Sequence, residues 1–364
     1  MSEWKEVQLG SVLEIKYGKD HKQLGEGVIP CLGSGGLMRY VDRYIYDEES
    51  ILIPRKGTLN NIMYQNSPFW TVDTMFWSKI DKSSVFPKFL FYQLTTVDYS
   101  ILNVGSAVPS LTVPVINEIT ISLPSLLEQR AIASILSSLD NKIDLLRRQN
   151  TTLEGMAETL FRQWFVVEAK EEWEEVELGE VIETTSGGTP SRSNMGFYKG
   201  GSINWVKSKE LNGTFILDTE EKISEEALKK SSAKILPKNS VLIAMYGATV
   251  GEYGIITKEM TCNQAVCALK PNENYPYTYL FQLVKFNKDE LINMAVGSAQ
   301  QNISQLLIKK IPVLNCIERI KEFHSVVNPS FEKIKSNHNQ IYTLTALRDT
   351  LLPKLMNGEV RVEE

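Results

Sequence analysis

The chain has 364 residues, a formal net charge of −5, and 43% hydrophobic against 23% charged residues. This composition is typical of a globular protein with room for two domains of ordinary size, and the acidic balance argues only weakly against nucleic-acid binding, because phosphate contacts need just a local basic face. No apolar run approaches the roughly 18 to 20 residues of a membrane span, and the first residues lack the apolar core of a signal peptide, so we expect a cytoplasmic protein without membrane contact.

The two halves of the chain repeat each other. WKEVQLGSVLEIKYG at residues 4–18 returns as WEEVELGEVIETTSG at residues 173–187, an offset of 173 − 4 = 169. ILIPRKGT at 51–58 matches VLIAMYGA at 241–248 with an offset of 190, at which Asp73 falls on Asn263. ETLFRQWF at 158–165 matches DTLLPKLM at 349–356 with an offset of 191. Order and spacing persist, so the sequence predicts one fold used twice.

Each half begins with a pattern that favours strands. Apolar residues alternate with polar ones in residues 7–15 and again in 176–181. Glycine-, serine- and asparagine-rich stretches, such as 33–36 and 186–194, are typical of loops. The aromatic and β-branched run at 69–77 is typical of a buried or half-buried strand. The sequence therefore predicts mixed α/β domains with polar loops.

Two stretches with helical character follow these strand-rich parts. From Ile132 to Trp164, apolar residues recur at alternating spacings of four and three, a heptad pattern that needs a partner helix. The corresponding part of the second half gives a less regular pattern, and we expect the two to bury their seams together. The seam residues are Leu139, Ile143, Leu146, Asn150, Leu153 and Leu160 in the first half, and Ile334, His338, Ile341, Leu344, Leu351 and Leu355 in the second.

A proline suggests where these helices break. Pro329 aligns with Ser138, because 329 − 138 = 191. A proline inside a helix lacks the N–H donor and clashes with the preceding turn, so we expect both helices to break there. The long pieces that follow, 139–166 and 330–356, would each measure about 40 Å at about 1.5 Å per residue. We expect Pro353 to kink the second piece near its end and Gly358 to stop it.

The sequence shows no residues arranged for catalysis. It has no GxxxxGK[ST] phosphate loop, and Gly33 and Gly35 lack the third glycine of a dinucleotide fingerprint. Three histidines and four cysteines without a CxxC pair predict neither a catalytic triad nor a zinc site, and buried reduced thiols are the better interpretation. NPSF at 328–331 approaches the Asn-Pro-Pro-Phe motif of amino-methyltransferases, but with serine at its third position and no glycine-rich loop it favours a helix cap. We expect no enzyme activity, cofactor or metal.

Six stretches carry a resemblance to a known family. They are IPCLGSGGLMRY (29–40), ILIPRKGTLNNIMY (51–64), FWTVDTMF (69–76), LPSLLEQRAIASILSSLDNKIDLLRRQNTTLEGMAETLFRQWFV (123–166), VLIAMYGATVGEYGI (241–255) and TCNQAVCAL (261–269). Together they resemble the specificity subunit of type I restriction-modification systems over essentially the whole chain. The most specific piece is LLEQRAIASILSSLDNKIDLLRRQN, and at 364 residues the chain is on the short side for such a subunit.

The resemblance implies an α+β fold. Two similar α/β target-recognition domains would each be followed by a long helix, and the two helices would pair as an antiparallel coiled coil. We expect the first recognition domain at 1–124, a central helical region at 125–168, the second recognition domain at 169–313 and a C-terminal helical region at 314–364.

The resemblance also implies a function and partners. Each domain would read one half of a split, asymmetric sequence in double-stranded DNA, and the helices would set the gap; about 40 Å is commensurate with one DNA turn of about 34–36 Å. Two modification subunits would flip and methylate an adenine, and restriction subunits would add translocation and cleavage. The chain itself would be the non-catalytic subunit of that complex.

Residues on loops are the candidates for DNA contact, since cations reach phosphate or guanine and amides pair with adenine. In the first half they are Ser34, Gly35, Arg39, Arg55, Lys56, Thr58, Asn60, Asn61, Ser106 and Ser110. In the second half they are Ser186, Thr189, Arg192, Lys207, Ser208, Lys209, Tyr246, Thr249, Gln300, Gln301 and Asn302. Tyr246 stands where Lys56 does, which predicts different half-sites. Asn263 and Gln264, inside an apolar run, are better interpreted as core amides than as base readers.

One alternative from another class stays open. A non-catalytic coiled-coil scaffold, whose duplicated domains bind peptide or glycan, would show the same repeat and the same heptads. DNA binding in a gel-shift experiment separates the two.

Overall fold

The computed structural model describes residues 4–295 and 302–362. The chain divides into two compact units. The first unit comprises residues 1–143 and 343–364, and the second unit comprises residues 144–342. Each of the two long helices contributes one part to each unit, so the first unit is made of two separate stretches of chain, whereas the second unit is one continuous stretch.

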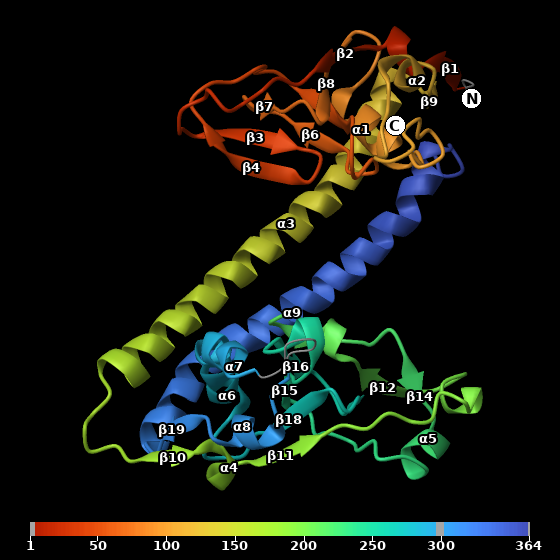
Figure 1. The fold of residues 1–364 in the computed structure, drawn as a ribbon. Helices are drawn as coiled ribbons and strands as arrows, with labels where there is room; N and C mark the ends of the chain where they lie inside the picture. The colour runs from red at the N-terminus through yellow and green to blue at the C-terminus, as the bar shows by residue number, and fades with distance from the viewer. Residues whose placement is uncertain (1–3, 296–301, 363–364) are drawn as a thin grey trace. The chain divides into compact units, whose positions relative to one another are not determined.

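The first unit contains three small sheets (Figure 1). A two-stranded sheet pairs β1 (Lys5–Gln8) with β9 (Thr120–Leu123). A four-stranded antiparallel sheet has the order β2 (Leu13–Tyr17), β8 (Met75–Ile80), β5 (Ser50–Pro54) and β6 (Met63–Gln65). A three-stranded sheet has the order β4 (Gly36–Val41), β3 (Ile29–Gly33) and β7 (Trp70–Thr71), and β3 and β7 are parallel. The short helices are η1 (Leu9–Ser11), α1 (Pro87–Thr95) and α2 (Val113–Asn117).

The second unit repeats this plan. Strand β10 (Glu175–Glu177) pairs with β19 (Pro312–Leu314). A five-stranded sheet has the order β11 (Glu183–Ser186), β18 (Val266–Lys270), β15 (Val241–Ala244), β16 (Tyr253–Ile256) and β13 (Phe215–Ile216). A three-stranded sheet has the order β14 (Lys222–Ile223), β12 (Ile203–Val206) and β17 (Thr261–Cys262), again with a parallel pair. The shorter helices are α4 (Leu178–Val181), η3 (Met195–Phe197), η4 (Ser208–Glu210), α5 (Glu225–Lys229), η5 (Gly247–Thr249), α6 (Tyr277–Phe286), α7 (Lys288–Asn293) and α8 (Gln305–Lys309).

Equivalent backbone hydrogen bonds confirm that the two units share one fold. An isolated bridge joins Lys56 to Ser110 in the first unit, and another joins Tyr246 to Asn302 in the second. Next to these bridges, Leu111 N donates to Arg55 O at 2.9 Å, and Ile303 N donates to Met245 O at 2.9 Å. The likeness of the halves therefore lies in the framework, whatever side chains that framework carries.

Each unit builds its core from a sheet together with the ends of the long helices. All residues of β5 and of β15 are buried, and all are apolar except Ser50, whose hydroxyl donates to Ser78 O at 2.8 Å. In the first unit, Leu136 and Leu355 of the long helices join the core around Phe89. In the second unit, Phe161 and Phe323 of the long helices join the core around β15 and α6. The helices are therefore integral to both cores.

The two long helices are uninterrupted, so the predicted break is wrong. Helix α3 runs over Leu126–Arg162 and continues into a π-helical turn, η2 (Gln163–Val167), while α9 runs over Ile317–Met356. Pro329 and Ser325, whose carbonyl loses its helical donor, are both exposed, so water can satisfy that carbonyl. The helix also continues through Pro353. It ends at Met356, before Gly358 with a φ of 74°, as the sequence predicted.

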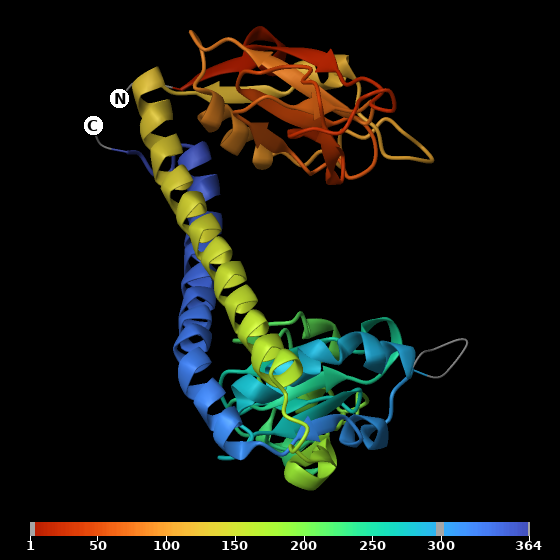
Figure 2. The same cartoon turned by 90° about the vertical axis from the view of Figure 1, so that its left-hand side faces the viewer.

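Side-chain pairs show that the two helices run antiparallel, as expected. In the first unit, Arg348 Nη1 donates to Asp140 Oδ1 at 2.9 Å. In the second unit, Asn337 Nδ2 donates to Asn150 Oδ1 at 2.8 Å. Between the two pairs, the lower residue number on α9 goes with the higher one on α3, which is the order of an antiparallel pair. Figure 1 and Figure 2 show α3 and α9 each as one long helix.

The structure places every predicted seam residue in a buried or half-buried position. It also shows that the residue of α9 opposite Asn150 is Asn337 and not the predicted His338. The ring of His338 does not reach Asn150; its Nε2 shares a hydrogen bond of 2.6 Å with Thr214 Oγ1. Asn337, which sequence reasoning missed, is fully buried and faces Asn150. The irregular heptads of the second half left the position of this amide open.

Two half-buried histidines make the stability of the second unit depend on pH. His324 Nδ1 shares a hydrogen bond of 2.8 Å with the buried Thr278 hydroxyl, and His338 bonds Thr214. Burial lowers the pKa of both imidazoles below the ordinary value of 6.5. The unfolded chain then binds protons more readily than the folded chain as the pH falls below 6.5. The contribution of these two histidines to the free energy of unfolding is therefore fully present above pH 6.5. It is lost as the pH falls from 6.5 through the lowered pKa values.

Thermal unfolding measured about one pH unit above and below pH 6.5 tests this pH dependence of stability. The wild-type chain should unfold at a lower temperature on the acid side. A chain with His324→Gln and His338→Gln keeps hydrogen-bonding groups that do not titrate, and its pH dependence should be flatter. An equally steep dependence in this variant would assign the effect to other groups.

Candidate nucleic-acid interface

Four loops of the first unit meet beside the ends of β3, β5 and β7. The loop after β3 is tied to the loop after β5, because Asn61 Nδ2 donates to Ser34 O at 2.8 Å. The loop after β7 is tied to both, since Ser34 N donates to Thr74 Oγ1 at 3.4 Å and Arg55 N donates to Thr74 O at 2.8 Å. The candidate residues of the first half, distant in sequence, are thereby brought together.

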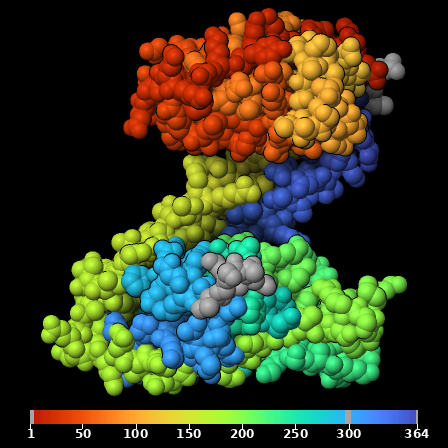
Figure 3. Space-filling view, viewed as in Figure 1, coloured from red at the N-terminus to blue at the C-terminus, as the bar shows by residue number. Residues whose placement is uncertain are grey.

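The segment between α1 and α2 completes this junction. Gly57 N donates to Pro109 O at 2.9 Å, and Gly57 has a φ of 90°, which favours glycine. The segment itself is held by Asn103, whose Oδ1 accepts from Gly105 N at 2.9 Å and from Ser110 N at 2.8 Å. In the space-filling view this light-orange segment lies against the red and orange part of the first unit (Figure 3).

Some of the predicted contact residues are free to bind a ligand. Lys56, Thr58 and Ser106 are exposed. Lys56 has no ion-pair partner within the described part of the chain. Arg55 is half-buried, with Nη1 3.2 Å from Asp73 O and its guanidinium 5.4 Å from the centre of the Tyr17 ring. These side chains place two positive charges at the junction of the loops.

Other predicted residues serve the scaffold instead. Arg39 is half-buried and donates to the carbonyl oxygens of His21 and Leu24. Asn60 Oδ1 accepts from Tyr99 N at 3.1 Å, and Asn61 holds Ser34. These polar groups already have partners within the chain, so their first role is to fix the loops.

A cavity of about 710 Å³ opens beside the junction. Its lining includes the β3–β4 turn with Ser34 and Gly35, which were predicted, and Asp73 and Thr74, which were not. Leu37 and Met38 of β4 also line the cavity and are about half exposed, at 53% and 54%. The sequence did contain a signal for Asp73 and Thr74, because these two polar residues interrupt the aromatic and apolar run FWTVDTMF.

The second unit has the equivalent loops with different side chains. Tyr246 is exposed and bridges to Asn302. Thr249 Oγ1 donates to Tyr246 O at 3.2 Å, and Ser186 Oγ donates to Gln305 Oε1 at 2.9 Å. Ser208 is half-buried at the start of η4. Gln300 and Gln301 lie outside the described residues.

The predicted cations of the second unit are all paired with carboxylates. Arg192 donates to both carboxylate oxygens of Glu221, at 3.0 and 2.7 Å. Lys207 Nζ lies 2.9 Å and Lys209 Nζ 2.7 Å from Glu220 Oε2. Hydrogen bonds from Lys209 and Lys207 lower the pKa of Glu220 to about 2. Each of these three cations has a carboxylate partner, unlike Lys56 of the first unit.

The interpretation of Gln264 as a core amide is wrong. Gln264 is exposed, and Thr189 Oγ1 donates to its Oε1. Its neighbour Asn263 is half-buried, and Asn263 Oδ1 accepts from Ala265 N at 3.2 Å. The apolar run hid a turn, because Asn263 and Gln264 lie between β17 and β18 and not within a strand.

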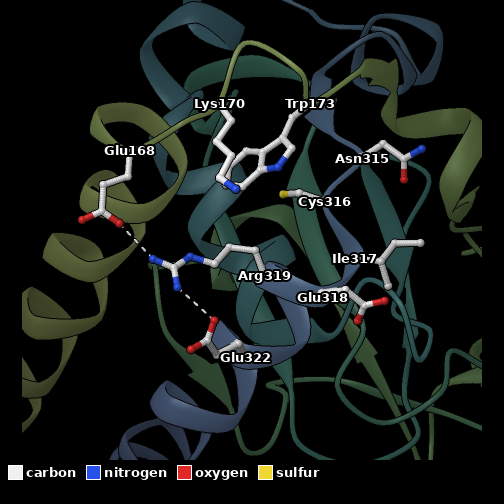
Figure 4. A pocket seen from close by; sticks show the side chains of 9 residues that line it. All are labelled: Glu168, Lys170, Trp173, Asn315, Cys316, Ile317, Glu318, Arg319 and Glu322. Carbon is white, nitrogen blue, oxygen red and sulfur yellow. Dashed lines mark hydrogen bonds and ion pairs between the residues drawn. The ribbon is translucent and has the colours of Figure 1, made fainter.

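A second cavity, of about 730 Å³, lies in the second unit where α3 ends and α9 begins (Figure 4). Arg319 crosses it, bonded to Glu168 and Glu322 at 2.9 Å each, with its guanidinium 3.6 Å from the centre of the Trp164 ring. Glu318 adds a third carboxylate to the lining, against the cations of Arg319 and Lys170. An acidic lining disfavours phosphate, and no predicted contact residue lies here.

The described residues contain no cluster of metal ligands and no exposed thiol. Within residues 4–295 and 302–362, no three His, Cys, Asp or Glu side chains are grouped to hold a metal. The four cysteines are buried free thiols, as the sequence predicted. Burial raises the pKa of Cys262 and Cys267 to about 12. None of the helices in the described ranges has the length and apolarity to cross a membrane.

Comparisons with known proteins agree with this architecture. The family model described as type I restriction modification DNA specificity domain matches residues 1–155 and 170–314. The MjaIX specificity subunit of Methanocaldococcus jannaschii is 27% identical over 351 residues, covering 88% of this chain and 79% of that protein. The HindI specificity subunit of Haemophilus influenzae is 25% identical over 362 residues, covering 76% and 78%.

A solved structure shares the fold. The S subunit of a type I restriction-modification system from M. genitalium superposes with a TM-score of 0.71 at 17% identity, covering 97% of this chain and 96% of that one. The class defined by the duplicated α+β units and their antiparallel helices is the DNA specificity subunit, a non-catalytic part of the type I enzyme. The chain belongs to the type I restriction-modification DNA specificity family. Membership decides against the alternative of a peptide- or glycan-binding scaffold.

Proposed function

We propose that each unit reads one half of a split, asymmetric sequence in double-stranded DNA, through the loops that meet beside its sheets. The observation that carries the proposal is the equivalence of Lys56 and Tyr246. Both residues form the same bridge in the same framework, yet one is a cation and the other an aromatic hydroxyl. Two readers with one geometry and different chemistry suit two different half-sites.

The partners follow from the non-catalytic role of the chain, because other subunits must carry out the reactions on DNA. The chain directs two modification subunits, which methylate an adenine in each site, and restriction subunits, which translocate and cleave DNA. The recognition domains extend over 1–124 and 169–313, and the helical regions at 125–168 and 314–364 set the gap between the half-sites. The complex acts on DNA in the cytoplasm.

Methylome sequencing tests the proposal. Cells that express the modification subunits should show one split, asymmetric adenine motif when this chain is present and lose it when the chain is absent. A symmetric motif, or an unchanged methylome, would contradict the two-reader arrangement. Purified complexes with Lys56→Ala should discriminate less among duplexes that differ in the half-site of the first unit, and should keep their discrimination at the half-site of the second unit.

The ion pairs of the second unit lead to a separate prediction. Glu220 and Glu221 compete with DNA phosphates for Arg192, Lys207 and Lys209. A chain with Glu220→Gln and Glu221→Gln should therefore bind non-specific duplex DNA more tightly, with the salt slope steeper by about 0.9 for each phosphate newly neutralised. The matched control is Glu225→Gln with Glu226→Gln on α5. Unchanged or weaker binding by the first variant would place these cations away from DNA.

A further inference from the structure

One residue in each unit is held between two anchored neighbours. In the first unit, Val72 N donates to Leu32 O at 3.0 Å, and Thr74 O accepts from Arg55 N at 2.8 Å. Asp73 lies between them and is exposed. The backbone on both sides is fixed to the framework, so the Asp73 side chain is presented from a rigid position.

The second unit presents Gln264 in the same way. Asn263 N donates to Val206 O at 2.9 Å, and Ala265 O accepts from Met245 N at 2.7 Å. Gln264 between them is exposed. These bonds make Gln264 the equivalent of Asp73, because 264 − 73 = 191, whereas the repeat in the sequence had set Asn263 against Asp73.

The surroundings of Asp73 restrict what it can bind. It lines the cavity of the first unit together with Ser34 and Gly35. Arg55 donates to its main-chain oxygen and not to its carboxylate, and no cation forms an ion pair with that carboxylate in the residues that the structure describes. An unpaired carboxylate beside Arg55 and Lys56 repels phosphate, and it only accepts hydrogen bonds. In the major groove of DNA, its partners are the exocyclic amino groups of cytosine and adenine.

Gln264 has the complementary chemistry. Thr189 Oγ1 donates to Gln264 Oε1 and orients the amide. A carbonyl oxygen has two lone pairs, so one remains, and within residues 4–295 and 302–362 neither Nε2 hydrogen has an acceptor. An amide that accepts and donates side by side matches N6 and N7 of adenine.

Resting on the proposed function, we propose that Asp73 and Gln264 are base-reading residues, one for each half-site. Asp73 accepts a hydrogen bond from the exocyclic amino group of one cytosine or adenine. Gln264 makes a pair of hydrogen bonds to one adenine. The framework is common to both units, and this single outward position changes the base that each unit selects.

Selection from a randomised duplex library tests this, with the complex of this chain and its modification subunits. Asp73→Ala should lower the discrimination at one base pair of one half-site between about 5-fold and about 150-fold, leaving the other half-site unchanged. Gln264→Ala should do the same at one base pair of the other half-site. Asp73→Asn keeps the shape but adds a donor, and should move the preference at the same base pair toward adenine. Asp47→Ala, an exposed aspartate of the same unit outside the cavity, is the matched control.

The outcomes separate this inference from the proposed function. If the wild-type complex selects no split site, the proposed function fails. If it selects one and the Asp73 and Gln264 variants select the same bases with the same discrimination, the inference is overturned. Thermal unfolding shows whether a variant that loses all binding is folded. A folded Asp73→Ala complex that loses affinity equally for every duplex also overturns base reading.

Discussion

Replacing Phe323 with alanine is expected to destabilise the second unit by about 3–5 kcal/mol. Phe323 lies in the first part of α9 and is fully buried. Its ring centre lies 5.9 Å from that of Phe161 at the end of α3, and 5.4 Å and 6.0 Å from those of Phe165 and Trp164 in η2. The truncation leaves a cavity where α3, α9 and the core of the unit meet, and it removes several edge-to-face ring contacts.

Denaturant unfolding followed by tryptophan fluorescence measures the effect, because Trp164 lies against the substituted ring. Phe286→Ala is the matched control: its ring centre is 5.9 Å from that of Phe161, but the side chain is 41% exposed. We expect this control to lose clearly less stability, since less apolar surface leaves water at that position. Equal losses for the two variants would mean that α9 is not packed into the core.

The long helices show what periodicity predicts and what it misses. Heptad spacing predicted both helices and their mutual burial, because a regular apolar stripe is a local property of the sequence. The break at Pro329 was wrong, because the cost of a proline depends on whether the freed carbonyl meets water. Ser325 is exposed, and a sequence pattern does not show on which side of a helix solvent lies.

The candidate interface shows the same limit for polar residues. Loop composition predicted that Lys56 and Thr58 lie outside the strands, and both residues are exposed on a loop. Arg39 is instead bound to His21 and Leu24, and Asn60 to Tyr99, which lies 39 residues away. Such bonds depend on tertiary structure. Gln264 was assigned to the core for the converse reason, since its apolar neighbours concealed the three-residue turn between β17 and β18.

Removing one amide of the Asn150–Asn337 pair is expected to destabilise the second unit by about 1–3 kcal/mol. Asn150 is 5% and Asn337 0% exposed, and one hydrogen bond joins them. Asn150 Nδ2 and Asn337 Oδ1 have no hydrogen-bond partner among the residues that the structure describes. Asn337→Leu would leave the whole Asn150 amide buried without its partner. Gln340→Leu, on the exposed side of α9, is the control and should have little effect.

The double variant separates stability from register. With Asn150→Leu and Asn337→Leu no polar group is left buried at this level, so stability should return to the wild-type value or exceed it. Leucines pack in several registers, whereas a single amide pair is satisfied in only one, so the double variant should lose definition of the helix pairing. Size-exclusion chromatography should then reveal additional oligomers, and methylome sequencing should reveal motifs with more than one gap length. A double variant as unstable as Asn337→Leu, or one that keeps a single gap, would show that the amides do not select the register and that the shapes of the apolar seam residues alone do so.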